Sequence, residues 1–293
     1  MSAFIQILRP YQWTKNLFCF AGIIFGGRLF ELDTFVTIAI IFLLFSLVAS
    51  AIYIFNDIAD KRYDRLHPVK RNRPIASGKV SVSTGMWLGI LLSLAGVIGA
   101  YLLHFSVFII LILYIFSNAL YSIKLKHIPI LDVFTIASGF ILRLLSGIYV
   151  LGITPTAWVV LCTFFLALFL GFAKRRTELF KSEERVVVQQ RPVLTRYSIP
   201  FLDSLVNDAG LLTIVNYAMF TTLSGKNSSL IITVPIVYFA ITHYKQMIIM
   251  HCKGEEPETV ILRDWKLLLS IITWLITFIL IFYLDLELFN NVV

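Results

Sequence analysis

Residues 34–64 read TFVTIAIIFLLFSLVASAIYIFNDIADKRYD, an apolar run that ends in an acidic segment. The run up to residue 56 carries no charge. It is longer than the roughly 20 residues that a helix needs to cross the hydrocarbon core of a bilayer. Three aspartates follow, Asp57, Asp60 and Asp64, with spacings of three and four residues. The stretch therefore predicts a membrane-spanning helix whose end carries carboxylates.

The composition of the whole chain is typical of a membrane protein. Of its 293 residues, 58% are hydrophobic and only 14% are charged, whereas an ordinary soluble domain has about 45–50% and about 25%. This excludes a water-soluble globular protein. A backbone that crosses lipid must satisfy its own hydrogen bonds, so the long apolar runs predict helices. We expect an all-α bundle of nine transmembrane helices, near residues 12–30, 34–56, 83–103, 105–122, 130–151, 156–173, 199–223, 229–250 and 266–285.

Two of these nine predicted spans are interrupted by residues that break or polarise a helix. The first contains Gly22, Gly26 and Gly27, and the seventh contains Asp203, Asn207 and Asp208 in its first half. Both are consistent with helices that line a cavity. No fixed-period repeat or low-complexity tract divides the chain, so we expect a single domain over residues 1–293.

The basic residues are distributed unevenly over the loops between the nine predicted spans. Of the 25 Lys and Arg residues, 22 fall on one side, Arg28 and Lys226 fall on the other, and Arg143 lies inside a span. Cytoplasmic loops of membrane proteins carry the excess of Lys and Arg. The pattern therefore predicts a cytoplasmic N-terminus and an external C-terminus. It also explains the net charge of +8 without a nucleic-acid partner.

The cysteines exclude two further classes of protein. Cys19, Cys162 and Cys252 are far apart and do not follow the spacing of metal ligands. We therefore expect neither a disulfide framework nor a zinc module.

The aspartates after the second span are the clearest candidates for a functional site. If the helix continues to residue 64, Asp57, Asp60 and Asp64 lie on one of its faces. Neighbouring carboxylates repel one another unless a cation neutralises them, and Mg²⁺ commonly bridges carboxylates to substrate phosphates. The alternative is a solvated helix end whose acids balance the basic residues around it.

A basic loop follows the aspartates directly. Residues 65–78 read RLHPVKRNRPIASG and contain four cations. Beside a metal held by carboxylates, such a loop suits a polyphosphate, because the metal takes some oxygens and Lys or Arg takes the others. Taken alone the loop favours anchoring at the membrane surface. Next to three aspartates it favours phosphate binding.

The pattern Asn56-Asp57-x-x-Asp60-x-x-x-Asp64 resembles the first acidic motif of the UbiA superfamily of intramembrane prenyltransferases. The resemblance implies a nine-helix bundle that binds a diphosphate through Mg²⁺ at its cytoplasmic end. Further motifs resemble one branch, the decaprenyl-phosphate phosphoribosyltransferases. They are RPxQWxKN at 9–16, HPxKRxRPIASG at 67–78, Tyr121 through Lys126 followed by Asp132, KRxxEL at 174–179, PE at 257–258 and LRD at 262–264.

This second resemblance implies an activity and a set of site residues. The implied enzyme is an integral protein of the bacterial inner membrane. It transfers 5-phosphoribose from phosphoribosyl pyrophosphate to a polyprenyl phosphate of the decaprenyl type and releases pyrophosphate, on the way to cell-envelope arabinan. Mg²⁺ is the implied cofactor, with Asp57, Asp60 and Asp64 as catalytic metal ligands. The implied substrate-binding residues are Lys15, Asn56, Lys70, Arg73, Tyr121, Lys126, Asp132, Lys174, Arg175 and Glu178. The sequence leaves the oligomeric state open, a homo-oligomer included.

One segment separates this activity from its main alternative. Prenyltransferases of the superfamily usually carry a second aspartate-rich motif after the sixth span, where residues 174–178 here read KRRTE. Three cations repel a second Mg²⁺ but attract phosphate oxygens. The alternative reading is membrane anchoring with a salt-bridged Glu178. The runner-up enzyme is a prenyltransferase acting on an aromatic acceptor such as 4-hydroxybenzoate.

Two ionisable residues in the middle of the chain have more than one interpretation. Asp132 either joins the metal site or pairs with Lys126 and caps the fifth predicted helix. Arg143 lies three turns later on about the same face and requires a partner inside the bundle. That partner is either a ligand or a carboxylate such as Asp203 or Asp208. A path lined by these residues would instead suit a transporter or a non-catalytic lipid-binding protein.

Overall fold

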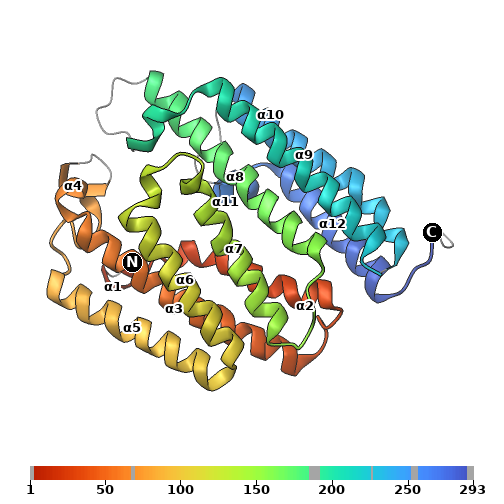
Figure 1. Ribbon diagram of the computed structural model, residues 1–293, viewed down its shortest axis with the longest axis horizontal. Helices are drawn as coiled ribbons and strands as arrows, with labels where there is room; N and C mark the ends of the chain where they lie inside the picture. The colour runs from red at the N-terminus through yellow and green to blue at the C-terminus, as the bar shows by residue number, and fades with distance from the viewer. Residues whose placement is uncertain (1–2, 67–69, 185–191, 226, 252–256, 289–293) are drawn as a thin grey trace. The chain divides into compact units, whose positions relative to one another are not determined.

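The computed structural model describes residues 3–66, 70–184, 192–225, 227–251 and 257–288, and this part of the chain contains helices and loops but no strand (Figure 1). His67, Pro68 and Cys252 lie outside the described residues. The α-helices are α1 (Ala3–Leu8), α2 (Ala21–Gly26), α3 (Leu32–Ala59), α4 (Lys61–Leu66), α5 (Val82–Leu103), α6 (Phe105–Ile123), α7 (Leu131–Tyr149), α8 (Ala157–Glu184), α9 (Ile199–Leu223), α10 (Val234–His251), α11 (Pro257–Arg263) and α12 (Trp265–Tyr283). The 3-10 helices are η1 (Pro10–Phe20), η2 (Lys70–Asn72), η3 (Leu125–His127), η4 (Pro192–Arg196) and η5 (Ser228–Thr233).

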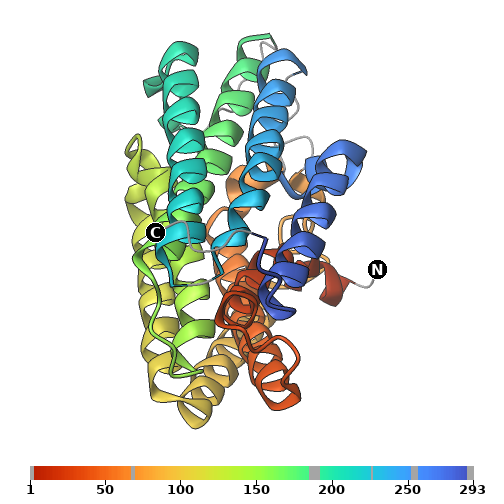
Figure 2. The same cartoon turned by 90° about the vertical axis from the view of Figure 1, so that its right-hand side faces the viewer.

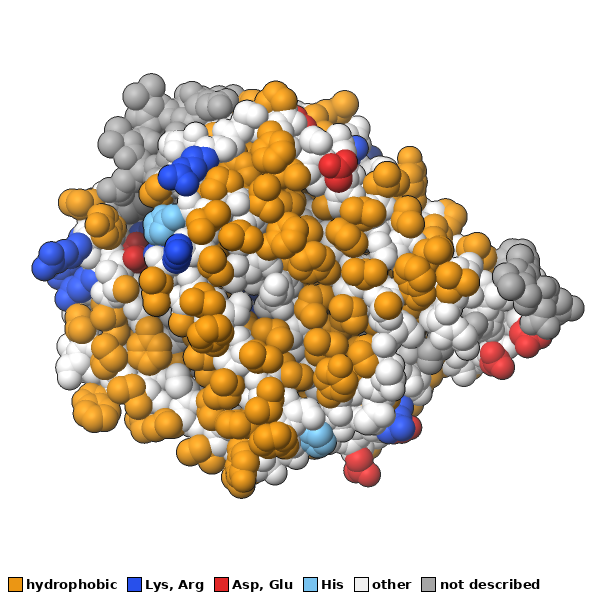
Figure 3. Space-filling view, in the orientation of Figure 1, with side chains coloured by type: hydrophobic (Ala, Val, Ile, Leu, Met, Phe, Trp, Pro, Cys, Tyr) orange, Lys and Arg blue, Asp and Glu red, His pale blue; other side chains and the backbone are white. Residues whose placement is uncertain are grey.

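Six of the described helices are long and apolar enough to cross a membrane, namely α3, α5, α6, α7, α8 and α12. Large apolar side chains on their outer faces are exposed, such as Leu102 at 77% and Trp87 at 66%. Figure 3 shows hydrophobic side chains over most of the visible surface. A surface of this kind is stable in lipid and not in water, so the chain is an integral membrane protein.

The other three predicted spans are helical too, but they differ in regularity. Residues 199–223 form α9, whereas residues 229–250 are divided between η5 and α10. The first predicted span is divided between η1 and α2, and Gly27 ends α2 in the left-handed region with φ of 77°. The first span is thus interrupted, as its glycines indicated, while the count of nine spans stays a prediction.

The chain divides into two compact units, and the single domain of the sequence analysis stays a prediction. Unit 1 comprises residues 1–125 and 142–154, and unit 2 comprises residues 126–141 and 155–293. In unit 1, α3 packs against α5 and η1 around a core that includes Ile38, Phe45 and Leu111. In unit 2, α8 packs along α9, α9 contacts α10, and α10 contacts α12 (Figure 2).

Polar side chains define where several of these helices begin. The Ser81 hydroxyl accepts a hydrogen bond from the Thr84 N–H at the start of α5, and Ser198 does the same for Phe201 at the start of α9. Asp264 caps α12 by accepting from the Leu267 N–H at 2.9 Å. Each side chain satisfies a backbone donor that the first helical turn leaves unpaired.

A close approach of two backbones holds the second half of α7 within unit 1. A Cβ on Gly22 of α2 would stand 2.6 Å from the carbonyl carbon and oxygen of Gly147 in α7. A Cβ on Gly147 would overlap the backbone carbonyl of Cys19. A backbone atom cannot turn aside as a side chain can, so both positions require glycine.

We expect the Gly147→Ala substitution to lower the free energy of unfolding by about 1–3 kcal/mol or more, because it overpacks a backbone contact. Thermal unfolding of the purified protein in detergent measures the effect. Gly85→Ala is the matched control, since the nearest atoms to its Cβ would be side-chain carbons of Ile75, Ile58 and Ile54 at 3.2, 3.5 and 3.6 Å. Equal melting temperatures for the two variants would contradict the prediction.

Candidate functional site

The acidic segment lies where α3 ends. α3 stops at Ala59, Asp60 forms a one-residue turn, and α4 begins at Lys61. The helix does not continue without interruption to residue 64, so the condition for all three aspartates to share one helical face is not met. Asp57 and Asp64 are both buried with 3% exposure, whereas Asp60 is half-buried. All three aspartates belong to unit 1, where Asp57 and Asp64 are buried and Asp60, at the interruption, is more accessible.

Two guanidinium groups neutralise the buried aspartates. Nη1 of Arg73 lies 3.1 Å from Oδ1 of Asp57 and 2.7 Å from Oδ2 of Asp64. Nη2 of Arg9 lies 2.5 Å from the same Asp57 oxygen. We call these four residues the carboxylate cluster. It combines two negative charges with two positive charges in a place from which water is largely excluded.

Arg9 belongs to this cluster, and the sequence analysis did not select it as a site residue. Its backbone lies in the left-handed region with φ of 52°, and its guanidinium stacks 5.1 Å from the centre of the Tyr53 ring. A non-glycine residue in this region is uncommon, and such strain gathers at functional sites. The signal was present in the sequence, because Arg9 opens the RPxQWxKN motif.

The carboxylate cluster offers two carboxylates to a divalent cation. Oxygens of Asp57 and Asp64 both lie within 3.1 Å of one cationic nitrogen of Arg73, so they already converge on a point of positive charge. Mg²⁺ binds carboxylate oxygens at about 2.0–2.1 Å, which requires these oxygens to close in by up to about 1 Å. In the part of the chain that is described, no three His, Cys, Asp or Glu side chains gather to hold a metal. The residues present thus fit a two-carboxylate site, and Asp60 is not gathered with them.

The other predicted site residues of unit 1 lie on several elements. Lys15 of η1 donates a hydrogen bond to Oε1 of Gln12 at 2.6 Å, and Asn56 of α3 accepts one from the Ser122 hydroxyl at 2.9 Å. Lys70 is in η2 and half-buried. Tyr121 is half-buried and directly precedes Ser122 in α6. The Asn56–Ser122 bond joins the end of α3 to the end of α6.

Arg143 has different partners from those suggested by the sequence. Its Nε lies 2.7 Å from Oδ1 of Asn16 and its Nη2 lies 2.8 Å from the Tyr114 hydroxyl. The Tyr114 ring centre is 4.7 Å from the guanidinium carbon. Asp203, one of the two partners suggested, accepts a hydrogen bond from Arg176 at 2.7 Å instead. Hydrogen bonding and a cation–π contact therefore stabilise this buried charge within unit 1.

Unit 2 contains a second group of interacting polar side chains, which we call the Asp132 cluster: Asp132, Arg175, Glu178 and Tyr197. Nε of Arg175 lies 2.7 Å from Oδ2 of Asp132, and its Nη1 lies 2.8 Å from Oε2 of Glu178. The Tyr197 hydroxyl donates to Oδ1 of Asp132 at 2.7 Å. Asp132 therefore pairs with Arg175, and the suggested pair with Lys126 was wrong. Lys126 itself is half-buried in η3.

Tyr197 is a site residue that the sequence analysis missed, and no motif pointed to it. Its hydroxyl accepts a hydrogen bond from the Ile130 N–H at 2.5 Å, and Ile130 has a φ of 70°, a genuine outlier for a β-branched residue. Burial raises the pKa of Tyr197 above its ordinary value, and the Asp132 carboxylate adds to the rise. The hydroxyl therefore stays protonated and donates to Asp132.

The segment KRRTE does not present three equivalent cations. Arg175 is bound to Asp132 and Glu178, and Arg176 donates both to Asp203 and to the Ile248 carbonyl at 3.0 Å. Both arginines are buried, whereas Lys174 is half-buried. Glu178 is salt-bridged, as one of the two interpretations of this segment expected. The two arginines stabilise unit 2, and Lys174 is the more accessible cation.

Comparison with known proteins identifies the family. Residues 16–260 match the UbiA prenyltransferase family. The chain belongs to this family. Two similar proteins are the decaprenyl-phosphate phosphoribosyltransferases of Mycolicibacterium smegmatis and Corynebacterium glutamicum, each 30% identical over 290 residues. The alignments cover 94% and 96% of this chain and 91% and 86% of the relatives. The UbiA protein described here is accordingly a transferase of the membrane.

Solved structures support the same fold. A UbiA homolog from Archaeoglobus fulgidus bound to GPP and Mg²⁺ superimposes with a TM-score of 0.72 at 18% identity, covering 95% of this chain and 99% of that one. A structure of digeranylgeranylglyceryl phosphate synthase gives a TM-score of 0.66 at 16% identity, covering 94% and 98%. The Archaeoglobus protein has also been solved with Cd²⁺. The likeness confirms the all-helical UbiA fold.

Proposed function

We propose that this UbiA protein transfers 5-phosphoribose from phosphoribosyl pyrophosphate to a polyprenyl phosphate and releases pyrophosphate. The relatives named decaprenyl-phosphate phosphoribosyltransferase support the pairing of substrates. The observation that carries the proposal is the carboxylate cluster, where Asp57 and Asp64 converge on one cationic nitrogen. Buried carboxylates beside arginines suit a metal-bound diphosphate, because each charged group then has an opposite charge to meet.

The carboxylate cluster is proposed to bind the donor. Arg9 and Arg73 release the aspartate carboxylates and bind phosphate oxygens of the pyrophosphate instead. Lys70 adds a third cation. This exchange would free the oxygens of Asp57 and Asp64 for Mg²⁺, and Asp60, which is not gathered with them in the structure, would turn inward as a third ligand. When bound by these carboxylates, Mg²⁺ would act as a Lewis acid that neutralises charge on the departing pyrophosphate. Lys15, Asn56 and Tyr121 lie in the same unit and are proposed to contact the sugar or its phosphate.

The Asp132 cluster and the neighbouring lysines are proposed to bind the acceptor phosphate. Lys174 and Lys126 offer half-buried ammonium groups, while Asp132 and Glu178 fix the Arg175 side chain. An oxygen of the lipid phosphate attacks the anomeric carbon as the bond to pyrophosphate breaks, by way of an oxocarbenium-like sugar. That oxygen is already anionic, so the reaction needs no general base. The product is a polyprenyl-phosphoryl-5-phosphoribose.

The distribution of basic residues supports an orientation for this chemistry. We propose that the enzyme resides in a bacterial inner membrane with its N-terminus in the cytoplasm and its C-terminus outside. The carboxylate cluster then opens to the side on which a soluble phosphorylated sugar is found. The isoprenoid tail of the acceptor stays in the lipid.

Incubation of the purified protein with Mg²⁺, labelled phosphoribosyl pyrophosphate and a polyprenyl phosphate tests the proposal. We expect label in the lipid fraction, and we expect removal of divalent metal with EDTA to stop the transfer. A parallel reaction offers a prenyl diphosphate and 4-hydroxybenzoate, because the Archaeoglobus neighbour was solved with GPP. Prenyl transfer in the second reaction without label transfer in the first would contradict the proposal. An absence of turnover in both would favour a transporter or lipid-binding protein.

A further inference from the structure

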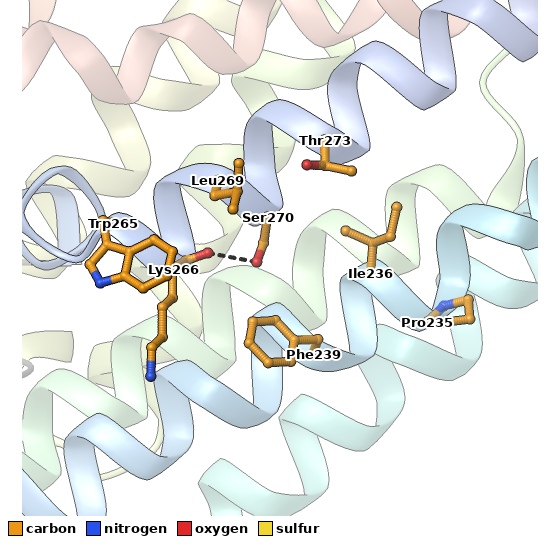
Figure 4. Close-up of a pocket in the computed structure, with 8 residues that line it drawn as sticks. All are labelled: Pro235, Ile236, Phe239, Trp265, Lys266, Leu269, Ser270 and Thr273. Carbon is orange, nitrogen blue, oxygen red and sulfur yellow. Dashed lines mark hydrogen bonds between the residues drawn. The ribbon is translucent and has the colours of Figure 1, made fainter.

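A groove outside both clusters runs between α10 and α12 in unit 2 (Figure 4). Its volume is about 530 Å³, which lies within the range of about 300–1,000 Å³ for small-molecule sites. Ile236 and Phe239 of α10 line one wall, and Leu269 and Thr273 of α12 line the other. The groove shares no residue with the carboxylate cluster or the Asp132 cluster.

The groove faces the hydrocarbon and not the interior of unit 2. Trp265, Leu269 and Phe239 are 68%, 53% and 48% exposed, and they lie on or beside α12, a membrane-spanning helix. Apolar side chains that face lipid are covered by lipid chains. Hydrocarbon therefore occupies the apolar part of this groove, along Phe239 and Leu269.

The length of the groove along α12 fits within the hydrocarbon part of one bilayer leaflet. At one end, Nε2 of His243 lies 3.2 Å from Oδ1 of Asp264 and ties α10 to the cap of α12. The His243 ring stacks on Phe239 with centroids 5.6 Å apart and an interplanar angle of 9°. From Lys266 to Thr273 the helix rises about 10 Å. A single leaflet contributes about half of the roughly 30 Å hydrocarbon core, so the groove accommodates one lipid chain.

Among the residues that line the groove, Lys266 is the one that carries a charge. Lys266 begins α12, and its Nζ lies 5.9 Å from the centre of the Trp265 ring. It forms no ion pair with any residue that the structure describes. The Ser270 hydroxyl donates to the Lys266 carbonyl at 2.7 Å, so it is already satisfied. The ammonium group is therefore the feature of the groove that selects a head group, and it selects a negative one.

We infer that the groove between α10 and α12 binds one anionic phospholipid of the surrounding bilayer, with an acyl chain against Phe239 and Leu269 and the phosphate at Lys266. One ammonium group matches the single charge of a phosphodiester better than the double charge of a monophosphate. Anionic phospholipids gather at the cytoplasmic surface, where the sequence places the start of α12. The site is separate from the transfer reaction and does not rest on it.

Quenching of tryptophan fluorescence by brominated lipid tests this inference. The protein is reconstituted in vesicles of phosphatidylglycerol and phosphatidylcholine, with bromine on the chains of one lipid or the other. The Trp265 signal is obtained by difference from Trp265→Phe. We expect brominated phosphatidylglycerol to quench Trp265 about fivefold more effectively than brominated phosphatidylcholine, since one Lys contributes about that factor. Lys266→Gln should remove this preference while quenching by phosphatidylcholine persists, which shows that the variant is folded.

Two matched controls separate the groove from general attraction to a basic surface. Trp87 on α5 is 66% exposed and should show no comparable preference, measured with Trp87→Phe. Lys79→Gln removes an exposed cation elsewhere and should leave the Trp265 preference intact. Equal preferences at Trp265 and Trp87, or a preference that survives Lys266→Gln, would overturn the inference. Displacement of brominated phosphatidylglycerol by equimolar polyprenyl phosphate would assign the groove to the acceptor instead and overturn it too.

Discussion

The Asp60→Asn substitution is expected to reduce phosphoribosyl transfer by at least about 10²-fold while leaving the melting temperature unchanged. A metal ligand that loses its charge forfeits several kcal/mol of transition-state stabilisation, and each 1.36 kcal/mol is a factor of ten. The Asp60 side chain forms no hydrogen bond or ion pair within the described chain, so its loss leaves no neighbour unpaired. Transfer of labelled phosphoribose and thermal unfolding in detergent measure the two effects.

Two companion variants make this result decisive. Asp33→Asn changes an exposed carboxylate at the other end of α3 and should retain full activity and stability. Asp57→Asn should lose activity and stability together, because Arg9 and Arg73 both lose an ion-pair partner. Near-normal transfer by the Asp60→Asn protein would remove Asp60 from the proposed metal site. Loss of stability in that variant would show that Asp60 serves the fold.

The Arg175→Met substitution is expected to lower the free energy of unfolding by about 3–5 kcal/mol, the usual cost of removing one partner from a buried ion pair. Arg175 is 2% exposed, and Asp132, its partner at 2.7 Å, is fully buried. Methionine fills much of the space but leaves the Asp132 carboxylate with the Tyr197 hydroxyl as its remaining hydrogen-bond donor in the described part of unit 2. Denaturant or thermal unfolding in detergent measures the loss.

A double variant and a neighbouring lysine test the cause. Adding Asp132→Asn to Arg175→Met removes the stranded charge and should recover part of the lost stability. Lys174→Met removes a half-buried cation next in sequence, and we expect it to raise the KM for polyprenyl phosphate with a much smaller change in stability. Similar stability losses for Lys174→Met and Arg175→Met would show that burial of the pair is not the reason.

Much of the fold could be predicted because its signals are local. The runs at 34–56, 83–103, 105–122, 130–151, 156–173 and 266–285 correspond to the six apolar helices, with ends that differ by a few residues. Length and apolarity decide such helices, and both are properties of the sequence alone. The first predicted span also depends on a tertiary contact. There Gly22 meets the backbone of Gly147, more than a hundred residues away, and no local pattern announces that contact.

The partners of the site residues were harder to predict than the residues themselves. Asp57, Asp64, Arg73, Asp132 and Arg175 were all selected from motifs, and the structure pairs them in two clusters. The choice of partner depends on which helices lie side by side. Tyr197 reaches Asp132 across 65 residues, and Arg9 reaches Asp57 across 48. The tyrosine stood in no motif, so the sequence offered no reason to select it.

By itself, the sequence determined that this chain is a helical membrane protein with carboxylates at the end of one span and cations around them. Apolar length and the spacing of charges decide whether a segment lies in lipid or in water, and every residue along a run meets the same surroundings. These properties can therefore be judged without knowing the fold. Only the tertiary structure decided that Arg73 lies between Asp57 and Asp64, that Arg143 rests on Asn16 and Tyr114, and that Arg175 and Arg176 are engaged inside unit 2. A buried charge takes whatever partner packing brings within about 3 Å, and packing is a property of the folded chain as a whole.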